Sequence, residues 1–125
     1  MTSQSGKLRI LVAEDDSIMR ELTTQMLGDL GHSVEAVENG SDALKAYRKN
    51  PFDAVILDIN MPVMNGLDTL RHLLRHDPDA RIVMLTGFDE TSVAESCVAN
   101  GAKDFVQKGL GPDALQKSLA TALRD

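Results

Sequence analysis

Residues 54–62 read AVILDINMP, and the fold can be worked out from this stretch. Four apolar residues, 54–57, lead directly into Asp58, and Asn60 and Pro62 then favour a turn. A short apolar run bounded by turn residues is typical of a strand that is buried on both faces of a sheet. Burying a carboxylate is costly unless it is paired or binds a metal ion. The aspartate at the end of this strand therefore requires an explanation.

Similar apolar runs recur along the chain and alternate with helical patterns. Strand-like runs occupy residues 8–13, 33–37, 54–57, 82–85 and 104–107. Five strands alternating with five helices predict an α/β fold, a doubly wound parallel sheet with helices on both faces. The apolar residues at helical spacing that mark the five helices are Ile18, Met19, Leu22, Met26 and Leu30; Ala43, Leu44 and Tyr47; Leu67, Leu70 and Leu74; Val93, Ala94, Cys97 and Val98; and Leu115, Leu119 and Leu123.

Helix boundaries carry signals of their own. Asp16 or Ser17 can cap the first helix, and Gly31 can end it. Pro112 suits the first turn of the fifth helix, where its missing N–H is no loss. These signals place the first helix directly after the first strand and the last helix near the end of the sequence.

Composition narrows the function classes. The chain has 125 residues, 42% of them hydrophobic, which suits one domain with a real core. The formal net charge of -6 repels phosphate backbones, so direct nucleic-acid binding is not expected. Residues 1–7 form a polar leader without the apolar segment of a signal peptide, and we expect it to be disordered. One cysteine and no membrane-length apolar run favour a cytoplasmic protein.

Polar groups follow four of the five expected strands. Because ligands bind beyond the carboxyl ends of parallel strands, these groups should meet at one edge of the sheet. Clustered carboxylates repel one another, and a set of oxygen ligands without His or Cys favours Mg²⁺. An ammonium, a hydroxyl and an exposed backbone N–H suit phosphoryl oxygens, so the parts indicate phosphoryl transfer to a carboxylate. The groups are Glu14, Asp15 and Asp16, then Asp58, then Thr86 and Gly87, then Lys108.

Four segments, in this order, resemble the receiver domain of two-component response regulators. They read LVAEDDSIMR (11–20), AVILDINMPVMNG (54–66), IVMLTG (82–87) and DFVQK (104–108). The resemblance extends over nearly the whole chain and places a receiver domain, similar to the chemotaxis regulators, at residues 8–125. It implies a flavodoxin-like (βα)5 fold with strand order 2-1-3-4-5.

The resemblance assigns a role to each acidic position. Asp58 matches the phosphoacceptor, which takes a phosphoryl group from the phosphohistidine of a histidine kinase. Glu14 and Asp15 match the acidic pair that binds Mg²⁺ together with Asp58, and Asn60 matches the residue whose backbone carbonyl completes the metal site. Asp16, the third acid, is expected to be the helix cap.

Further positions match the phosphoryl-binding and switch residues. Thr86 matches the hydroxyl that bonds the phosphoryl group, and Lys108 the lysine that pairs with a phosphoryl oxygen. Phe105 stands where the family has an aromatic ring that turns inward on activation. Asn60 and Phe88 occupy the two positions that tune phosphoryl lifetime, and we expect the bulky Phe88 to shield the phosphoaspartate from water.

One residue departs from the family pattern. Most receivers have proline directly after the lysine, whereas Gly109 follows Lys108 here. Glycine gives the loop more conformational freedom, so Lys108 must be positioned by another device.

The resemblance implies a phosphorylation-dependent switch that is not a turnover enzyme. Its partners would be a histidine kinase or phosphotransfer protein, and then an output domain, a target protein or a second copy of the chain. The fourth helix, fifth strand and fifth helix would form the responding surface.

Two alternatives remain at this stage. The first is a pseudo-receiver that binds partners without phosphorylation, which Gly109 favours and the intact Asp58, Thr86 and Lys108 oppose. The second is a phosphatase of the haloacid-dehalogenase type, which expects an acid two residues after the nucleophile. Asn60 occupies that position, so turnover of small phosphoesters is not expected.

Overall fold

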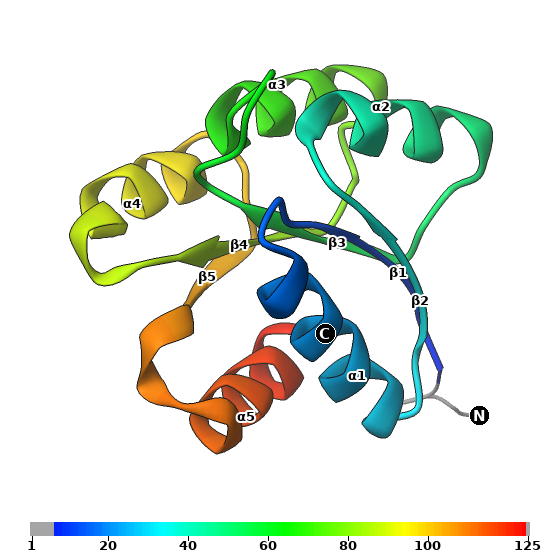
Figure 1. The fold of residues 1–125 in the computed structure, drawn as a ribbon. Coiled ribbons are helices and arrows are strands. Elements are labelled where there is room, and N and C mark those ends of the chain that lie inside the picture. Colours follow the sequence, from blue (N-terminus) through cyan, green and yellow to red (C-terminus); the bar gives the residue numbers. More distant parts are fainter. Residues whose placement is uncertain (1–6, 125) are drawn as a thin grey trace.

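The computed structural model describes residues 7–124, apart from the side chain of Phe88, and forms a sheet between two layers of helices (Figure 1). The predicted leader, residues 1–7, lies outside the described residues except for Lys7. The strands are β1 (Arg9–Ala13), β2 (Ser33–Val37), β3 (Ala54–Asp58), β4 (Ile82–Thr86) and β5 (Asp104–Gln107). The helices are α1 (Ser17–Asp29), α2 (Gly40–Lys49), α3 (Gly66–His76), α4 (Thr91–Ala99) and α5 (Pro112–Ala122), with short 3-10 turns η1 (Phe88–Glu90) and η2 (Lys108–Leu110).

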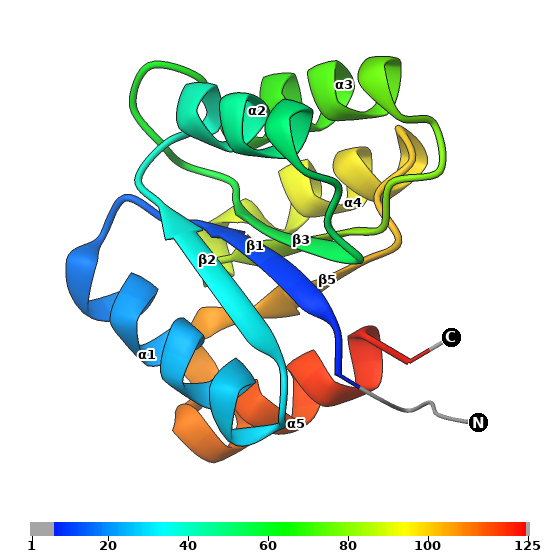
Figure 2. The ribbon, with the colours of Figure 1, turned by 90° about the vertical axis from the view of Figure 1, so that its right-hand side faces the viewer.

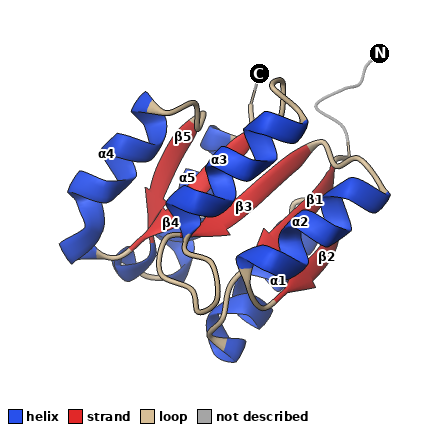
Figure 3. Ribbon diagram, turned by 90° about the horizontal axis from the view of Figure 1, so that it is seen from above, coloured by secondary structure: helices blue, strands red, loops and turns tan. Residues whose placement is uncertain are grey.

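The sheet has the predicted topology. Its strand order is β2-β1-β3-β4-β5, and all four neighbouring pairs are parallel (Figure 3). Helices α1 and α5 cover one face, and α2, α3 and α4 cover the other (Figures 1 and 2). The fold class and strand order expected from the sequence are therefore confirmed.

The central strands explain why the apolar runs were informative. Every residue of β3 and β4 is buried, because helices cover both faces of these strands. Successive residues alternate between two cores: Leu57 packs on the side of α2 and α3, and Ile56 on the side of α1 and α5. This double burial produces the continuous apolar run that precedes Asp58.

Helix α1 begins as predicted but buries less than predicted. Asp16 is its N-cap, with Oδ1 accepting from the N–H of Ile18 at 2.9 Å and of Met19 at 3.4 Å. Ile18 is nevertheless 78% exposed and Leu30 37% exposed, so the two ends of the predicted stripe lie outside the core. Helical spacing indicates a common face, but it does not determine which positions of that face the core covers.

None of the helices within residues 7–124 has the length and apolar character needed to cross a membrane.

Candidate functional site

Three strand ends bring a lysine and two buried acids into direct contact. The Nζ atom of Lys108, after β5, lies 2.8 Å from Oδ1 of Asp58 and 3.0 Å from Oε1 of Glu14. Glu14 and Asp58 are buried, whereas Asp15 is exposed. Carboxylate oxygens of Glu14, Asp15 and Asp58 all lie within 4.8 Å of one another. The structure thus gathers four of the predicted residues at the carboxyl edge of the sheet.

Backbone contacts fix the turn that carries the acidic pair. The N–H of Glu14 extends the β1–β2 ladder by donating to the carbonyl of Val37 at 3.1 Å. One guanidinium nitrogen of Arg20, on the first turns of α1, donates to the carbonyls of Glu14 at 2.9 Å and Asp15 at 3.3 Å. Arg20 was not among the residues predicted to belong to the site. Only its place one helical turn after the cap Asp16 could have indicated that it reaches back to this turn.

Close packing fixes the loop that follows Asp58. The N–H of Gly66 donates to the carbonyl of Ile59 at 2.8 Å, and a Cβ at Gly66 would lie 2.5 Å from the carbonyl oxygen of Asp58. Only glycine allows α3 to start this close to the end of β3. In the same loop Val63 has a φ of 71°, which a β-branched residue rarely adopts. The loop conformation is therefore set by its anchors at both ends.

Burial controls the charge state of the acids. Burial, followed by the interaction with Asp58, raises the pKa of Glu14 to about 8, although Lys108 opposes the shift. Burial likewise raises the pKa of Asp58 against the opposing effects of Glu14 and Lys108. For Lys108, burial lowers the pKa, but the hydrogen bonds and charges of the two acids outweigh it and the net shift is upward. The site therefore favours a positive charge next to its carboxylates.

The donor set fits a divalent cation. When ionised, three carboxylates and one ammonium leave two negative charges uncompensated, which is the charge of one divalent ion. The buried Oε1 of Glu14 and Oδ1 of Asp58 accept no hydrogen bond from any backbone N–H or hydroxyl within the described chain. Oxygen-only ligands of this kind suit Mg²⁺, which keeps several waters and uses one or two carboxylates. The residues therefore fit the cofactor expected from the sequence.

The end of β4 differs from the expectation in one respect. Thr86 is fully buried, and its hydroxyl donates to the carbonyl of Gly87 at 2.9 Å. The sequence predicted that the backbone N–H after this threonine would be exposed, but the N–H of Gly87 donates to Oε1 of Glu90 at 2.9 Å. Sequence reasoning missed Glu90, although its position three residues after Gly87 is the spacing of a capping box.

Gly109 does not prevent Lys108 from reaching the acids. Lys108 begins the 3-10 turn η2, which leads through Gly111, with a φ of 96°, into α5. The side chain of Lys108 is 24% exposed and contacts both Asp58 and Glu14. A short helical turn thus follows Lys108 at the place where most receivers have a proline.

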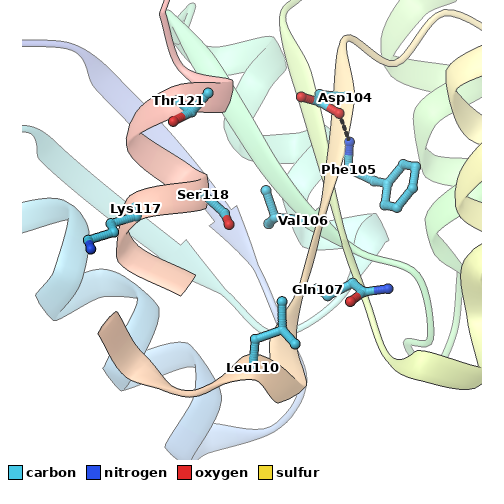
Figure 4. Close-up of a pocket in the computed structure, with 8 residues that line it drawn as sticks. All are labelled: Asp104, Phe105, Val106, Gln107, Leu110, Lys117, Ser118 and Thr121. Carbon is cyan, nitrogen blue, oxygen red and sulfur yellow. Dashed lines mark hydrogen bonds between the residues drawn. The ribbon is translucent and has the colours of Figure 1, made fainter. Parts of the chain in front are cut away.

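The remaining predicted residues lie around this centre without a contact that defines their roles. Asn60 is exposed in the loop after β3, and the side chain of Phe88 lies outside the described residues. Phe105, on β5, is half-buried and packs against the core on the side of α2, α3 and α4. Figure 4 shows its ring pointing away from α5, while Val106 points toward that helix. Its role as a switch remains a prediction.

A hollow of about 390 Å³ lies between β5 and α5. Asp104 to Gln107 and Leu110 line one side, and Lys117, Ser118 and Thr121 line the other (Figure 4). The hollow is distinct from the acidic site, because none of the three clustered carboxylates lines it.

The fold and the acidic edge together define a flavodoxin-like α/β domain with a cluster of three carboxylates and one lysine at the carboxyl ends of its strands. The chain belongs to the response regulator receiver domain family, whose model matches residues 10–120. It is therefore the receiver domain of a two-component response regulator, as the sequence motifs indicated.

Individual relatives agree with this assignment. The chain is 32% identical to the chemotaxis protein CheY of Listeria monocytogenes, covering 94% of this chain and 99% of that protein. The crystal structure of the receiver domain of NtrX from Brucella abortus superposes with a TM-score of 0.84 at 30% identity, covering 91% of this chain and 97% of that one. The transcriptional regulatory protein ZraR of Salmonella typhimurium is 34% identical over 94% of this chain, which spans only 27% of ZraR.

Proposed function

We propose that Asp58 is the phosphoacceptor of this receiver domain. An oxygen of its carboxylate attacks the phosphorus of a phosphohistidine, a P–O bond forms and the P–N bond breaks. The imidazole nitrogen leaves with the electron pair and takes a proton from solvent. The observation that carries this proposal is the ammonium of Lys108, which contacts both Asp58 and Glu14 at the carboxyl edge of the sheet.

Each neighbouring group has a part in this chemistry. Glu14, Asp15, Asp58 and the backbone carbonyl of Asn60 would hold Mg²⁺, which when bound offsets the negative charge of the phosphoryl oxygens. The ammonium of Lys108 keeps its charge in the buried site and pairs with a phosphoryl oxygen.

Thr86 supplies the hydroxyl that bonds the phosphoryl group, and Phe105 is the aromatic ring on β5 that responds. To bond the phosphoryl group, the hydroxyl of Thr86 must first break its hydrogen bond to the carbonyl of Gly87. Asn60 and Phe88 would set how long the phosphoryl group persists.

The receiver domain is proposed to extend over residues 8–125 and to follow a polar leader.

The proposed output is a change of the surface formed by α4, β5 and α5. A local charge change at Asp58 biases a two-state element, and the responding surface then binds an output domain, a target protein or a second copy of the chain. The phosphodonor is a histidine kinase or phosphotransfer protein of the cytoplasm. The domain accepts and loses its own phosphoryl group and does not turn over small phosphoesters.

Intact-mass measurement tests the proposal. Wild type is incubated with acetyl phosphate, a small phosphodonor, with Mg²⁺ and with EDTA, beside Asp58→Asn and the control Asp79→Asn. We expect one phosphoryl group on wild type and Asp79→Asn, only with Mg²⁺, and none on Asp58→Asn. Absence of any gain in folded wild type would instead support the pseudo-receiver, and sustained hydrolysis of an aryl phosphate would support a phosphatase.

A further inference from the structure

The two hydrogen-bond donors at the end of β4 are both occupied by acceptors of the following turn. The hydroxyl of Thr86 donates to the carbonyl of Gly87, and the N–H of Gly87 donates to the carboxylate of Glu90, each at 2.9 Å. Glu90 also donates to the same residue, because its own N–H bonds the carbonyl of Gly87 at 3.2 Å across η1. The contact is thus a reciprocal pair that fixes the turn before α4.

These donors lie beside the reacting carboxylate. In the β3–β4 register Leu85 is opposite Asp58, and the N–H of Ile59 donates to the carbonyl of Leu85 at 3.2 Å. Thr86 and Gly87 are the next two residues, so they extend the strand past Asp58 at the edge where a phosphoryl group would sit. A phosphoryl group brings strong acceptor oxygens and negative charge to this place.

Glu90 must compete with such a group. A backbone N–H has one proton and makes one strong hydrogen bond, and both the carboxylate and a phosphoryl oxygen are charged acceptors. Glu90 packs directly against Gly87, because a Cβ at Gly87 would lie 3.3 Å from its Oε1. The carboxylate of Glu90, bound to the N–H that an incoming phosphoryl oxygen would use, also adds a like charge that disfavours the arrival of an anion.

The inference rests on the proposed phosphorylation of Asp58. We propose that Glu90 is a positioning residue that opposes this phosphorylation, because it holds the N–H of Gly87 away from the phosphoryl group. Phosphorylation then requires Glu90 to release Gly87, which opens the reciprocal pair at the start of α4. The same contact therefore stabilises the unphosphorylated turn and connects the site to α4.

Rates of phosphoryl gain from acetyl phosphate with Mg²⁺ test this role in four proteins: wild type, Glu90→Gln, Glu90→Ala and Asp89→Asn. Glu90→Ala removes the acceptor, and we expect a rate about threefold to tenfold above wild type. Glu90→Gln keeps a neutral acceptor of similar length, so its rate should fall between the two. Asp89→Asn removes an exposed charge from the same turn and should match wild type.

A purely structural cap gives a different result. In that case Glu90→Gln would behave as wild type, and Glu90→Ala would lose stability without gaining phosphoryl groups faster. Rates for both Glu90 variants at or below wild type, or an equal gain in Asp89→Asn, would overturn the inference. Wild type that takes no phosphoryl group would overturn the proposed function as well, so the two failures are distinguishable.

The contact itself can be measured without a phosphodonor. In the unphosphorylated protein, the amide resonance of Gly87 should shift in Glu90→Ala and stay in place in Asp89→Asn. An unchanged resonance in both variants would contradict the hydrogen bond on which the inference depends.

Discussion

At the amino-terminal edge of the sheet two carboxylates each accept a hydrogen bond, whereas at the carboxyl edge three carboxylates cluster beside one ammonium that contacts two of them. On the amino-terminal side, the N–H of Arg9 donates to Asp53 at 2.8 Å, and the hydroxyl of Tyr47 donates to Asp77 at 2.7 Å. The guanidinium of Arg9 also lies 5.0 Å from the centre of the Phe52 ring. On the carboxyl side, the ammonium of Lys108 contacts both Glu14 and Asp58.

The two edges of the sheet have different roles: the amino-terminal edge contributes to stability and the carboxyl edge to function. Matched groups stabilise the native state and need nothing further, whereas buried like charges are unfavourable until an ion or ligand binds. Changes at the carboxyl edge should therefore alter phosphoryl chemistry and metal binding, and changes at the amino-terminal edge should alter stability alone.

The largest effect is expected from Lys108→Ala. This change removes the positive charge that contacts Asp58 and Glu14, and phosphoryl gain should slow by about 10²-fold. Initial rates from acetyl phosphate, followed by intact mass, measure the effect. Lys117→Ala, an exposed lysine on α5, is the matched control and should react as wild type. A rate for Lys108→Ala within twofold of wild type would refute the role of the lysine.

Mg²⁺ should stabilise the protein through the three clustered carboxylates. At a concentration ~100 times the dissociation constant, linkage predicts about 2.7 kcal/mol of added unfolding free energy. Thermal unfolding with Mg²⁺ and with EDTA measures this in wild type, Asp15→Asn and the control Asp79→Asn. We expect the stabilisation to be much reduced in Asp15→Asn and retained in the control. Equal stabilisation in all three proteins would place the ion elsewhere.

At the amino-terminal edge, Tyr47→Phe should lower the unfolding free energy by about 1 kcal/mol and leave the phosphorylation rate unchanged. The Tyr47 hydrogen bond holds the pKa of Asp77 below its usual value. A lowered folded pKa stabilises at pH values above the unfolded pKa of 3.8, and this contribution is lost as the pH falls through the folded pKa.

Urea unfolding near neutral pH and in acid checks this sign. The gap between wild type and Tyr47→Phe should narrow in acid. A gap that widened there, or a changed phosphorylation rate, would contradict the division between the two edges.

The smallest effect concerns His32, which directly precedes β2. Its Nδ1 accepts from the N–H of Leu8 at 3.1 Å, and burial lowers its pKa below 6.5. The neutral ring therefore stabilises the fold fully above pH 6.5, and this contribution is lost as the pH falls through the lower folded pKa. His32→Gln should show a flatter stability profile between neutral and mildly acidic pH. An identical profile would show that this contact is unimportant.

Strands were the most predictable part of the molecule. Residues 33–37 and 104–107 match β2 and β5 in both bounds, and the other three strands differ by one residue at one end. Apolar runs determine them because burial on both faces leaves little room for polar residues. The parallel topology then places Glu14, Asp58 and Lys108 together without further information.

Side-chain contacts between neighbouring turns were not predictable in the same way. Ile18 is exposed although it follows the apolar spacing of α1, because periodicity does not record which end of a helix the core covers. The contacts of Arg20 and Glu90 depend on the rotamers of long side chains that reach backbone groups in an adjacent turn. Spacing allows such contacts but does not select them.

Locating the phosphoryl group tests the central claim most directly. Borohydride reduces an acyl phosphate to an alcohol, so a phosphorylated aspartate becomes homoserine, which peptide mass spectrometry can place in the chain. After acetyl phosphate and Mg²⁺, we predict homoserine at position 58 and unmodified Glu14 and Asp15. Reduction at either of those two residues, with Asp58 unmodified, would contradict the account.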